Sequence, residues 1–474
     1  MAQLATADGT AGFSLRKVIV ASSVGTMIEW YDFYIFGSLA TVLATVFFPP
    51  GNRATAFLST LATFAIGFVV RPFGAAFFGR IGDMIGRKFT FLVTISLMGG
   101  ATFLVGLLPS FATAGWIAPG ILIILRLLQG LALGGEYGGA AIYVAEHAPD
   151  NRRGYFTSYI QTTATLGLVI SLIVVAGTDA LITRAYGEGA FEAWGWRIPF
   201  LLSGVLVAVA LYIRLSLKET PLFAKLKASG KTSKTPLRDS VQGGAWKLMA
   251  LALLGATAGQ GVVWYTGQFY ALLFMQNVLR ISLIDSSILV GAALVLATPF
   301  FLVFGALSDR IGRKPIILAG CALGALTFIP LFRALASAAC GLPPEGGFPE
   351  GFVCEPTLPA SLLLVGIVFL LVLYVTMVYG PIAAFLVELF PGRIRYTSLS
   401  LPYHIGNGMF GGIVPVVVTA LAARFGTSVG LLYPIGVATL TFFVGLFFIR
   451  ETYTNKIYEE IGAVSTPVPA GGSD

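Results

Sequence analysis

The segment "GRIGDMIGRKFTFL" (residues 79–92) returns in altered form as "GALSDRIGRKPIIL" (residues 305–318). A second pair follows in the same order, "YVAEHAPDNRRGYFTS" (143–158) and "FLVELFPGRIRYTS" (385–398). Two pairs in one order indicate that the second half of the chain is a diverged copy of the first. We therefore expect two bundles built from the same succession of elements.

The composition places these bundles in a lipid bilayer. The 474 residues are 56% hydrophobic and only 11% charged, whereas a typical soluble domain has about 25% charged residues. A membrane-spanning helix needs about 20 mostly apolar residues. Twelve runs of this kind are found, near 18–47, 54–79, 89–108, 117–145, 155–183, 198–216, 247–279, 286–307, 315–339, 359–390, 398–423 and 429–449. The sequence thus predicts an all-α integral membrane protein with twelve transmembrane helices in two pseudo-symmetric six-helix bundles.

The longest polar stretch, residues 217–244, separates the halves. We interpret it as a cytoplasmic linker between an N-terminal bundle (1–216) and a C-terminal bundle that ends in a short tail (245–474). Most of the 30 Lys and Arg residues fall on the side of the N-terminus in this scheme, and positively charged loops stay in the cytoplasm. Both termini are therefore predicted to be cytoplasmic. Residues 1–14 are polar, and no cleavage site follows, so the first helix is expected to be retained.

Several function classes are excluded. The formal charge is +8, but the charges lie in short loops between apolar runs, so nucleic-acid binding is not expected. Two isolated histidines and three scattered cysteines offer neither a metal site nor a nucleophile–base pair. No phosphate-binding loop is present. We expect no enzyme activity, no cofactor and no ATP-driven transport.

The loop motifs carry a family resemblance. "GDMIGRK" and "SDRIGRK" resemble the loop between helices 2 and 3 of the major facilitator superfamily and its copy between helices 8 and 9. Six further segments resemble the metabolite:proton symporter family within it: "IEWYDF" (28–33), "RPFGAAFFGRIGD" (71–83), "RLLQGLALGGEYGGA" (126–140), "AEHAP" (145–149), "WGWRIPF" (194–200) and "KETPLF" (218–223). The resemblance covers essentially the whole chain.

The resemblance implies the major facilitator fold and proton-coupled uptake of a small organic acid or a zwitterion. The protein would be a monomer in the bacterial cytoplasmic (inner) membrane, with the substrate, protons and lipid as its partners. Span 247–279 contains "GQGVVWYTGQFYALLFMQNVL", a region that differs widely among family members. The substrate is therefore not carried over from the family.

Five ionisable residues lie inside the predicted spans: Glu29, Asp32, Arg71, Arg126 and Glu136. Charged groups in a membrane span are costly, so they suggest a function and a partner. Their depths predict two groupings, Arg71 with Glu136 and Glu29, and Arg126 with Asp32. The alternative is a static network that only fixes helix packing.

We hypothesise that Asp32 carries the proton and Arg126 is its switchable partner, with Glu29 as the alternative carrier. Burial disfavours an ionised carboxylate and a nearby arginine favours it. An anionic substrate that binds Arg126 would weaken this pairing, so Asp32 would take up a proton as the substrate binds. A zwitterion could use the same switch, with Trp30, Trp264 or Tyr265 holding its cation. Two intramembrane arginines favour a carboxylate. An uncoupled facilitator and a nutrient receptor remain as alternatives.

Further candidates surround these charges. The predicted proton-coupling set is Asp32, Glu29, Arg126, Glu136 and Arg71. The predicted substrate contacts are Arg126, Trp30, Tyr31, Gln161, Gln260, Trp264, Tyr265, Gln268, Tyr379, His404 and Asn407. Core packing is the competing explanation for the aromatic rings and the histidine. Gly130, Gly134 and Gly138 form a small-residue stripe that permits close helix packing.

The loop motifs predict a gate rather than a binding site. Asp83 and Asp309 are predicted to lie at sharp cytoplasmic turns that contain glycine, where carboxylates suit helix N-termini and arginines. The predicted gating set is Asp83, Arg87, Asp309, Arg313, Arg153 and Arg395. Exposed ion pairs are individually weak, so the gate must combine several of them.

The second half carries an insertion, "CGLPPEGGFPEGFVC" (340–354). It would face an oxidising compartment in the predicted topology, where disulfides persist. We therefore expect a Cys340–Cys354 disulfide and a free thiol at Cys321.

Overall fold

A computed structural model describes residues 15–49, 53–84, 87–215, 235–241, 245–341, 348–349, 351–390, 394–455 and 457. Within these residues the structure is helical, apart from one isolated bridge between Ile281 and Cys354. Ten described helices are long and apolar enough to cross a membrane, and α1 with α2, bent by 61°, forms an eleventh span. The remaining predicted span is α5, whose apolar part is the shorter Leu92–Leu107. The all-α membrane fold is thus confirmed.

The described helices of the first half are α1 (Leu15–Ser38), α2 (Ala40–Phe47), α3 (Arg53–Val69), α4 (Arg71–Met84), α5 (Arg87–Leu107), α6 (Phe111–Ala114), α7 (Ile117–Gly134), α8 (Tyr137–His147), α9 (Arg153–Tyr186) and α10 (Arg197–Leu215). Short segments η1 (Asp150–Arg152) and η2 (Phe191–Gly195) precede α9 and α10. Helix α1 packs on α9 and α10, and α7 packs on α3, α4 and α5.

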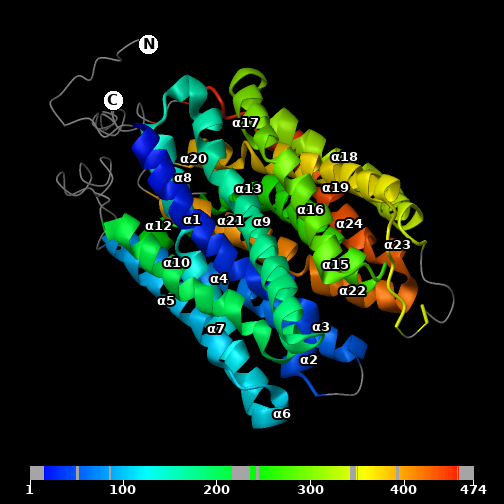
Figure 1. Ribbon diagram of the computed structural model, residues 1–474. Coiled ribbons are helices and arrows are strands. Elements are labelled where there is room, and N and C mark those ends of the chain that lie inside the picture. Colours follow the sequence, from blue (N-terminus) through cyan, green and yellow to red (C-terminus); the bar gives the residue numbers. More distant parts are fainter. Residues whose placement is uncertain are drawn as a thin grey trace, which may run out of the picture.

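The described helices of the second half are α13 (Ala245–Ala252), η4 (Leu253–Thr257), α14 (Ala258–Trp264), η5 (Tyr265–Tyr270), α15 (Ala271–Asn277), α16 (Leu283–Ala297), α17 (Pro299–Ile311), α18 (Arg313–Ala338), α19 (Leu358–Tyr379), α20 (Ile382–Leu389), α21 (Arg395–Tyr403), η6 (His404–Gly411), α22 (Val414–Phe425), α23 (Thr427–Gly430) and α24 (Leu432–Phe448). Figure 1 shows α5, α7 and α10 at one flank of the molecule and α18, α19 and α24 at the other. Of the predicted linker, only α12 (Pro236–Val241) and the residue before it lie within the described residues.

Several spans are interrupted inside the molecule. Helix α3 gives way to α4 at Val70, α7 to α8 at Gly135 and Glu136, and α19 to α20 at Gly380 and Pro381. Segments η5 and η6 are π-helical, a form that is frequent at functional sites. Irregular backbone at membrane depth is tolerated where protein surrounds it. The interruptions therefore mark where the two halves meet around a site.

The glycine stripe of α7 brings that helix against its neighbours. A Cβ on Gly130 would lie 2.0 Å from the carbonyl oxygen of Gly67, and a Cβ on Gly134 would lie 2.1 Å from that of Arg71. The stripe therefore sets the distance between α7 and the α3–α4 span, the packing role expected for it. It also holds Glu136, just beyond α7, close to the α4 residues.

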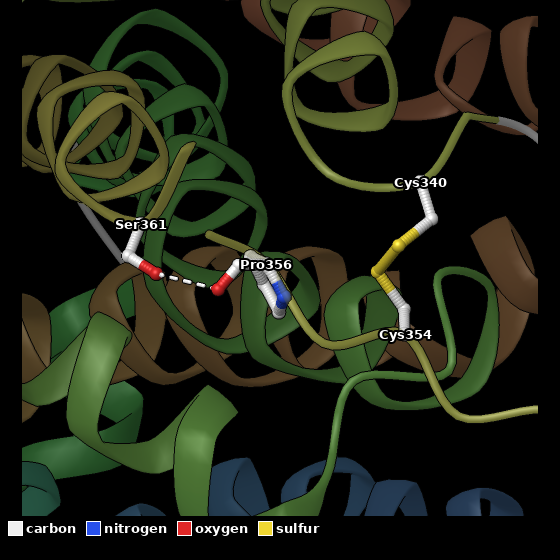
Figure 2. Close-up of a disulfide and its surroundings, with 4 residues drawn as sticks. All are labelled: Cys340, Cys354, Pro356 and Ser361. Carbon is white, nitrogen blue, oxygen red and sulfur yellow. Dashed lines mark hydrogen bonds between the residues drawn. A yellow bond between two sulfur atoms is a disulfide. The ribbon is translucent and has the colours of Figure 1, made fainter. Parts of the chain in front are cut away.

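The predicted disulfide is present. The Cys340 and Cys354 sulfur atoms are 2.01 Å apart (Figure 2). The Cys354 amide donates to the Arg280 carbonyl oxygen at 2.9 Å, which joins the end of the insertion to the loop after α15. Cys321 is buried and free, as expected. This end of the molecule is called the disulfide end below.

The stripe leads to a stability prediction. Gly130→Ala should lower the Tm of the purified protein in detergent by a few degrees, because the added methyl group meets backbone and overpacking costs about 1–3 kcal/mol. Gly120→Ala is the matched control on the same helix, since nothing lies within 4 Å of its Cβ position. Thermal unfolding measures both variants, and equal Tm values would show that α7 has room at Gly130.

Candidate functional site

A small cavity of about 10 Å³ lies between the two halves. This is room for roughly one water molecule. Its walls come from α1, α4 and the α7–α8 junction of the first half, and from the α21–η6 junction of the second. The lining residues are Thr26, Glu29, Trp30, Arg71, Leu133, Glu136, Tyr137, Tyr403 and His404. Two predicted acids, a predicted arginine and the predicted histidine thus meet in one place.

Arg71 is the dominant charge of this cavity. It is fully buried and begins α4, directly after the interruption at Val70. Its guanidinium carbon lies 4.1 Å from the ring centre of Phe68, 4.3 Å from that of Phe33 and 5.6 Å from that of Trp30. None of its three side-chain nitrogens has a hydrogen-bond partner among the described residues.

The aromatic rings do not neutralise this charge. Cation–π contacts contribute about 0.5–2 kcal/mol, less than the several kcal/mol that burying an ion costs. The predicted direct pairing of Arg71 with Glu136 is not made through a hydrogen bond among the described residues. Glu136 and Glu29 instead line the same cavity. The cavity thus combines one buried arginine with two carboxyl groups.

The predicted pairing of Asp32 with Arg126 is also absent. Asp32 is buried beside Ser203 of α10, whereas Arg126 lies 4.5 Å from the ring centre of Phe33. Consecutive helical residues point about 100° apart, so the face of α1 that carries Asp32 differs from the face that carries Phe33. Arg126 donates instead to Gln129 Oε1 at 2.6 Å. Depth along the helices alone therefore does not predict this pair, because two side chains at similar depth can point in different directions.

A chain of polar groups runs from the second half into the first. Gln260 Nε2 donates to Asn407 Oδ1 at 3.2 Å, and Asn407 Nδ2 donates to the Tyr403 hydroxyl at 3.2 Å. The hydroxyls of Tyr403 and Tyr379 are 2.7 Å apart. The Tyr403 ring stacks on Tyr137 of the first half, with centroids 3.5 Å apart. The predicted residues Gln260, Asn407 and Tyr379 thus gather in one place.

The sequence reasoning missed Tyr137 and Tyr403. Both adjoin residues that it selected, since Tyr137 follows Glu136 and Tyr403 precedes His404. The predicted Gln161 reaches the same cluster by donating to the Tyr137 hydroxyl at 2.7 Å. The signal in the sequence was this adjacency to residues that were already selected.

An aromatic stack crosses between the halves beside this cavity. Trp30 stacks on Tyr34 with centroids 5.2 Å apart, and Tyr34 stacks on Trp264 at 5.3 Å. Tyr265 follows at 4.8 Å from Trp264. The predicted Gln268 accepts a hydrogen bond from Thr165 of the first half at 3.1 Å.

Tyr31 does not join this group. Its hydroxyl donates to the Pro199 carbonyl oxygen at 2.8 Å, toward α10 and away from the stack. The substrate contact predicted for Tyr31 is therefore not supported by its orientation, because the neighbouring Trp30 occupies the face of α1 that lines the cavity.

A buried ion-pair network joins the halves where α9 begins, here called the Arg153 end. Arg153 of the first half donates to Glu388 Oε1 at 2.9 Å, and Arg313 of the second donates to the same oxygen at 2.9 Å. Arg313 also pairs with Asp309 at 2.7 Å. The Asp309 carboxylate accepts from the backbone amides of Gly154 and Tyr155 at 2.8 Å each. Asp309 thus caps the positive N-terminus of α9.

Of the remaining gating candidates, only the side chain of Arg395 lies within the described residues. Arg395 donates from Nε to the Phe390 carbonyl oxygen at 2.9 Å, within the second half. The side chains of Asp83 and Arg87 lie outside the described residues. Glu388 was not in the predicted set, although the internal repeat aligns it with Glu146.

This network leads to a prediction on dynamics. Glu388→Gln should speed hydrogen exchange at the amides of Gly154 and Tyr155, because breaking a buried pair on one side costs about 3–5 kcal/mol. Mass spectrometry of the α9 peptide measures the effect. Glu355→Gln, at an exposed position of the disulfide end, is the control. Unchanged exchange in Glu388→Gln would show that the halves are held together by other contacts.

Comparison with known proteins gives consistent matches. The family model described as sugar (and other) transporter matches residues 17–251 and 244–462. The inner membrane metabolite transport protein YhjE of Escherichia coli is 34% identical, over 93% of this chain and 95% of its own. The alpha-ketoglutarate permease of E. coli is 32% identical over 94% and 97%. The glycine betaine/proline/ectoine/pipecolic acid transporter OusA of Dickeya dadantii is 33% identical over 86% and 77%.

The solved structures agree on the fold. XylE, a proton:xylose symporter of the major facilitator superfamily, superimposes with a TM-score of 0.70 over 95% of this chain and 98% of its own. The two sequences are 18% identical, so this likeness concerns the fold alone.

Proposed function

This chain belongs to the sugar (and other) transporter family of the major facilitator superfamily, and on that premise we propose that it is a proton-coupled symporter that imports a small organic acid across a bacterial inner membrane. Its relatives are transporters rather than enzymes. The observation that carries the proposal is Arg71, a buried cation between the halves whose donors have no protein partner. Its neighbours Glu29 and Glu136 supply groups that can take up a proton.

The substrate carboxylate binds Arg71. A guanidinium group is always charged and offers two parallel donors to a carboxylate. The cavity is lined by both halves, so a substrate held there contacts both. This is the position in which secondary transporters hold their substrates while the halves move.

Glu29 carries the proton, with Glu136 as the second carboxylate of the same cavity. With no substrate bound, Arg71 supplies the positive charge of the cavity that Glu29 lines. A substrate carboxylate that occupies Arg71 adds a negative charge there, and Glu29 takes up a proton as the substrate binds. Substrate and proton then bind together. The coupling is the same as in the Asp32–Arg126 hypothesis. It is now assigned to Glu29 and Arg71, which line one cavity.

Two closures complete the transport cycle. The Arg153–Glu388–Arg313 network closes the Arg153 end. Toward the disulfide end, Phe269 lies against the backbone of Gly37, where a Cβ would be 2.0 Å from its ring. Phe269 also stacks on Phe64 with centroids 5.0 Å apart. Opening these closures in turn gives alternating access.

A zwitterion is the second candidate substrate. The stack of Trp30, Tyr34 and Trp264 beside Arg71 favours it, because aromatic faces attract quaternary ammonium groups. In that case Arg71 holds the carboxylate and the rings hold the cation. The relatives that transport betaines are as similar to this chain as the one that transports alpha-ketoglutarate.

The substrate prediction concerns Arg71. In proteoliposomes, wild-type protein should accumulate at least one member of a panel of radiolabelled carboxylates and betaines when a proton gradient is imposed. Arg71→Gln should weaken binding of that compound by about 30-fold or more, because a buried charge loses its partner. Arg71→Lys should recover only part of the affinity.

The exposed Arg333→Gln is the control for Arg71. Normal binding in Arg71→Gln would place the anion site elsewhere. Failure of every compound in the panel to respond to the gradient would argue against symport itself.

The coupling prediction compares two carboxylates. Glu29→Gln should abolish accumulation against a gradient and leave substrate exchange intact, because exchange needs no net proton movement. Asp32→Asn should still accumulate substrate, since Asp32 faces α10. Uptake and counterflow assays on the same vesicles measure both activities. The reverse result would restore Asp32 as the carrier.

A further inference from the structure

We propose that Arg126 is a second anion-binding group and that Arg71, Arg126 and Tyr265 together form a site for a dicarboxylate. This inference rests on the proposed function, since it assumes that Arg71 binds a carboxylate. It adds the substrate class: a small dianion rather than a monocarboxylate or a zwitterion.

The two arginines share one aromatic ring. The guanidinium carbon of Arg71 lies 4.3 Å from the ring centre of Phe33, and that of Arg126 lies 4.5 Å from the same centre. Both side chains are fully buried. The two carbons are therefore no farther apart than the sum of these distances. A four- or five-carbon dicarboxylate spans this separation when each carboxylate is in hydrogen-bond contact with one guanidinium group.

Two of the three side-chain nitrogens of Arg126 are not used in hydrogen bonds among the described residues. Its single hydrogen bond in the described structure joins Nη1 to Gln129, and its Nε and Nη2 have no partner there. Gln129 is held in turn by Thr102, whose hydroxyl accepts from Gln129 Nε2 at 2.8 Å. No described carboxylate pairs with Arg126. The remaining contacts of its guanidinium are the rings of Phe33, Phe36 and Phe64.

Tyr265 links the two arginines to the second half. It is close enough to interact electrostatically with both Arg71 and Arg126. Its hydroxyl is buried beside Tyr34 and Arg71, and its ring packs edge-on against Phe68 with centroids 5.1 Å apart. The same Phe68 contacts Arg71. A substrate between the arginines would therefore also meet a donor from η5.

Charge balance selects the dianion. Two buried cations that contact one ring repel each other. A monocarboxylate neutralises one of them and leaves the other buried, and a zwitterion brings no net negative charge. A dicarboxylate neutralises both. Glu29 and Glu136 line the same cavity as Arg71.

The test compares succinate with butyrate, which has the same number of carbons and one carboxylate. Calorimetric binding to purified full-length protein should show succinate binding about 30-fold or more tighter than butyrate. Arg126→Gln should weaken succinate binding by a similar factor and change butyrate binding by less than about twofold. Arg126→Lys should keep part of the preference, because it retains the charge.

Two results would overturn the inference: equal affinities of the wild-type protein for succinate and butyrate, or an Arg126→Gln variant that weakens both acids equally. The second result would assign Arg126 a packing role. If Arg126→Gln does not fold, Tyr265→Phe replaces it, and a loss of affinity confined to succinate is expected.

Different results would contradict the symporter proposal and the dicarboxylate inference. Proton-driven uptake of butyrate without preference for succinate would leave the symporter proposal standing and remove the dicarboxylate. Binding of glycine betaine with no binding of either acid would remove both and favour the zwitterion.

Discussion

A positive charge buried between the two halves is the constraint on which this structure depends. Arg71 lies there among aromatic rings, and its side-chain nitrogens form no hydrogen bond with a carboxylate among the described residues. Such a charge costs several kcal/mol unless something compensates it. In a transporter, the group that neutralises the buried charge can be the substrate. Substrate binding then stabilises the interface between the two halves, which move relative to each other during transport.

The backbone around Arg71 is arranged to permit movement. Helices are interrupted at Val70, at Glu136 and after Tyr379, and η5 and η6 are π-helical. Each interruption places a polar or charged side chain beside the interface. Lipid could not satisfy irregular backbone, but surrounding protein can. The interruptions are therefore positions at which the helices can bend, and they lie at the depth of the proposed site.

The halves contribute unequally to this site although they are copies of one another. The first supplies the charges, Glu29, Arg71 and Glu136, whereas the second supplies hydroxyl, amide and ring groups such as Tyr265 and Tyr403. Charge recognition and proton uptake can therefore remain in one rigid half. The second half closes over the substrate through hydrogen bonds and aromatic contacts, which are individually weak and can be remade in each cycle.

The sequence by itself determined the spans, the duplication, the Cys340–Cys354 disulfide and the identity of the buried charges, because these depend on local composition and spacing. It also indicated that Arg153, Asp309 and Arg313 act together, since the repeat marks their positions. Only the tertiary structure decided which charge faces which neighbour. Asp32 and Phe33 are adjacent, yet one points toward α10 and the other contacts two arginines. Helical periodicity gives the relative directions of side chains on one helix, but the packing of several helices decides what each direction meets.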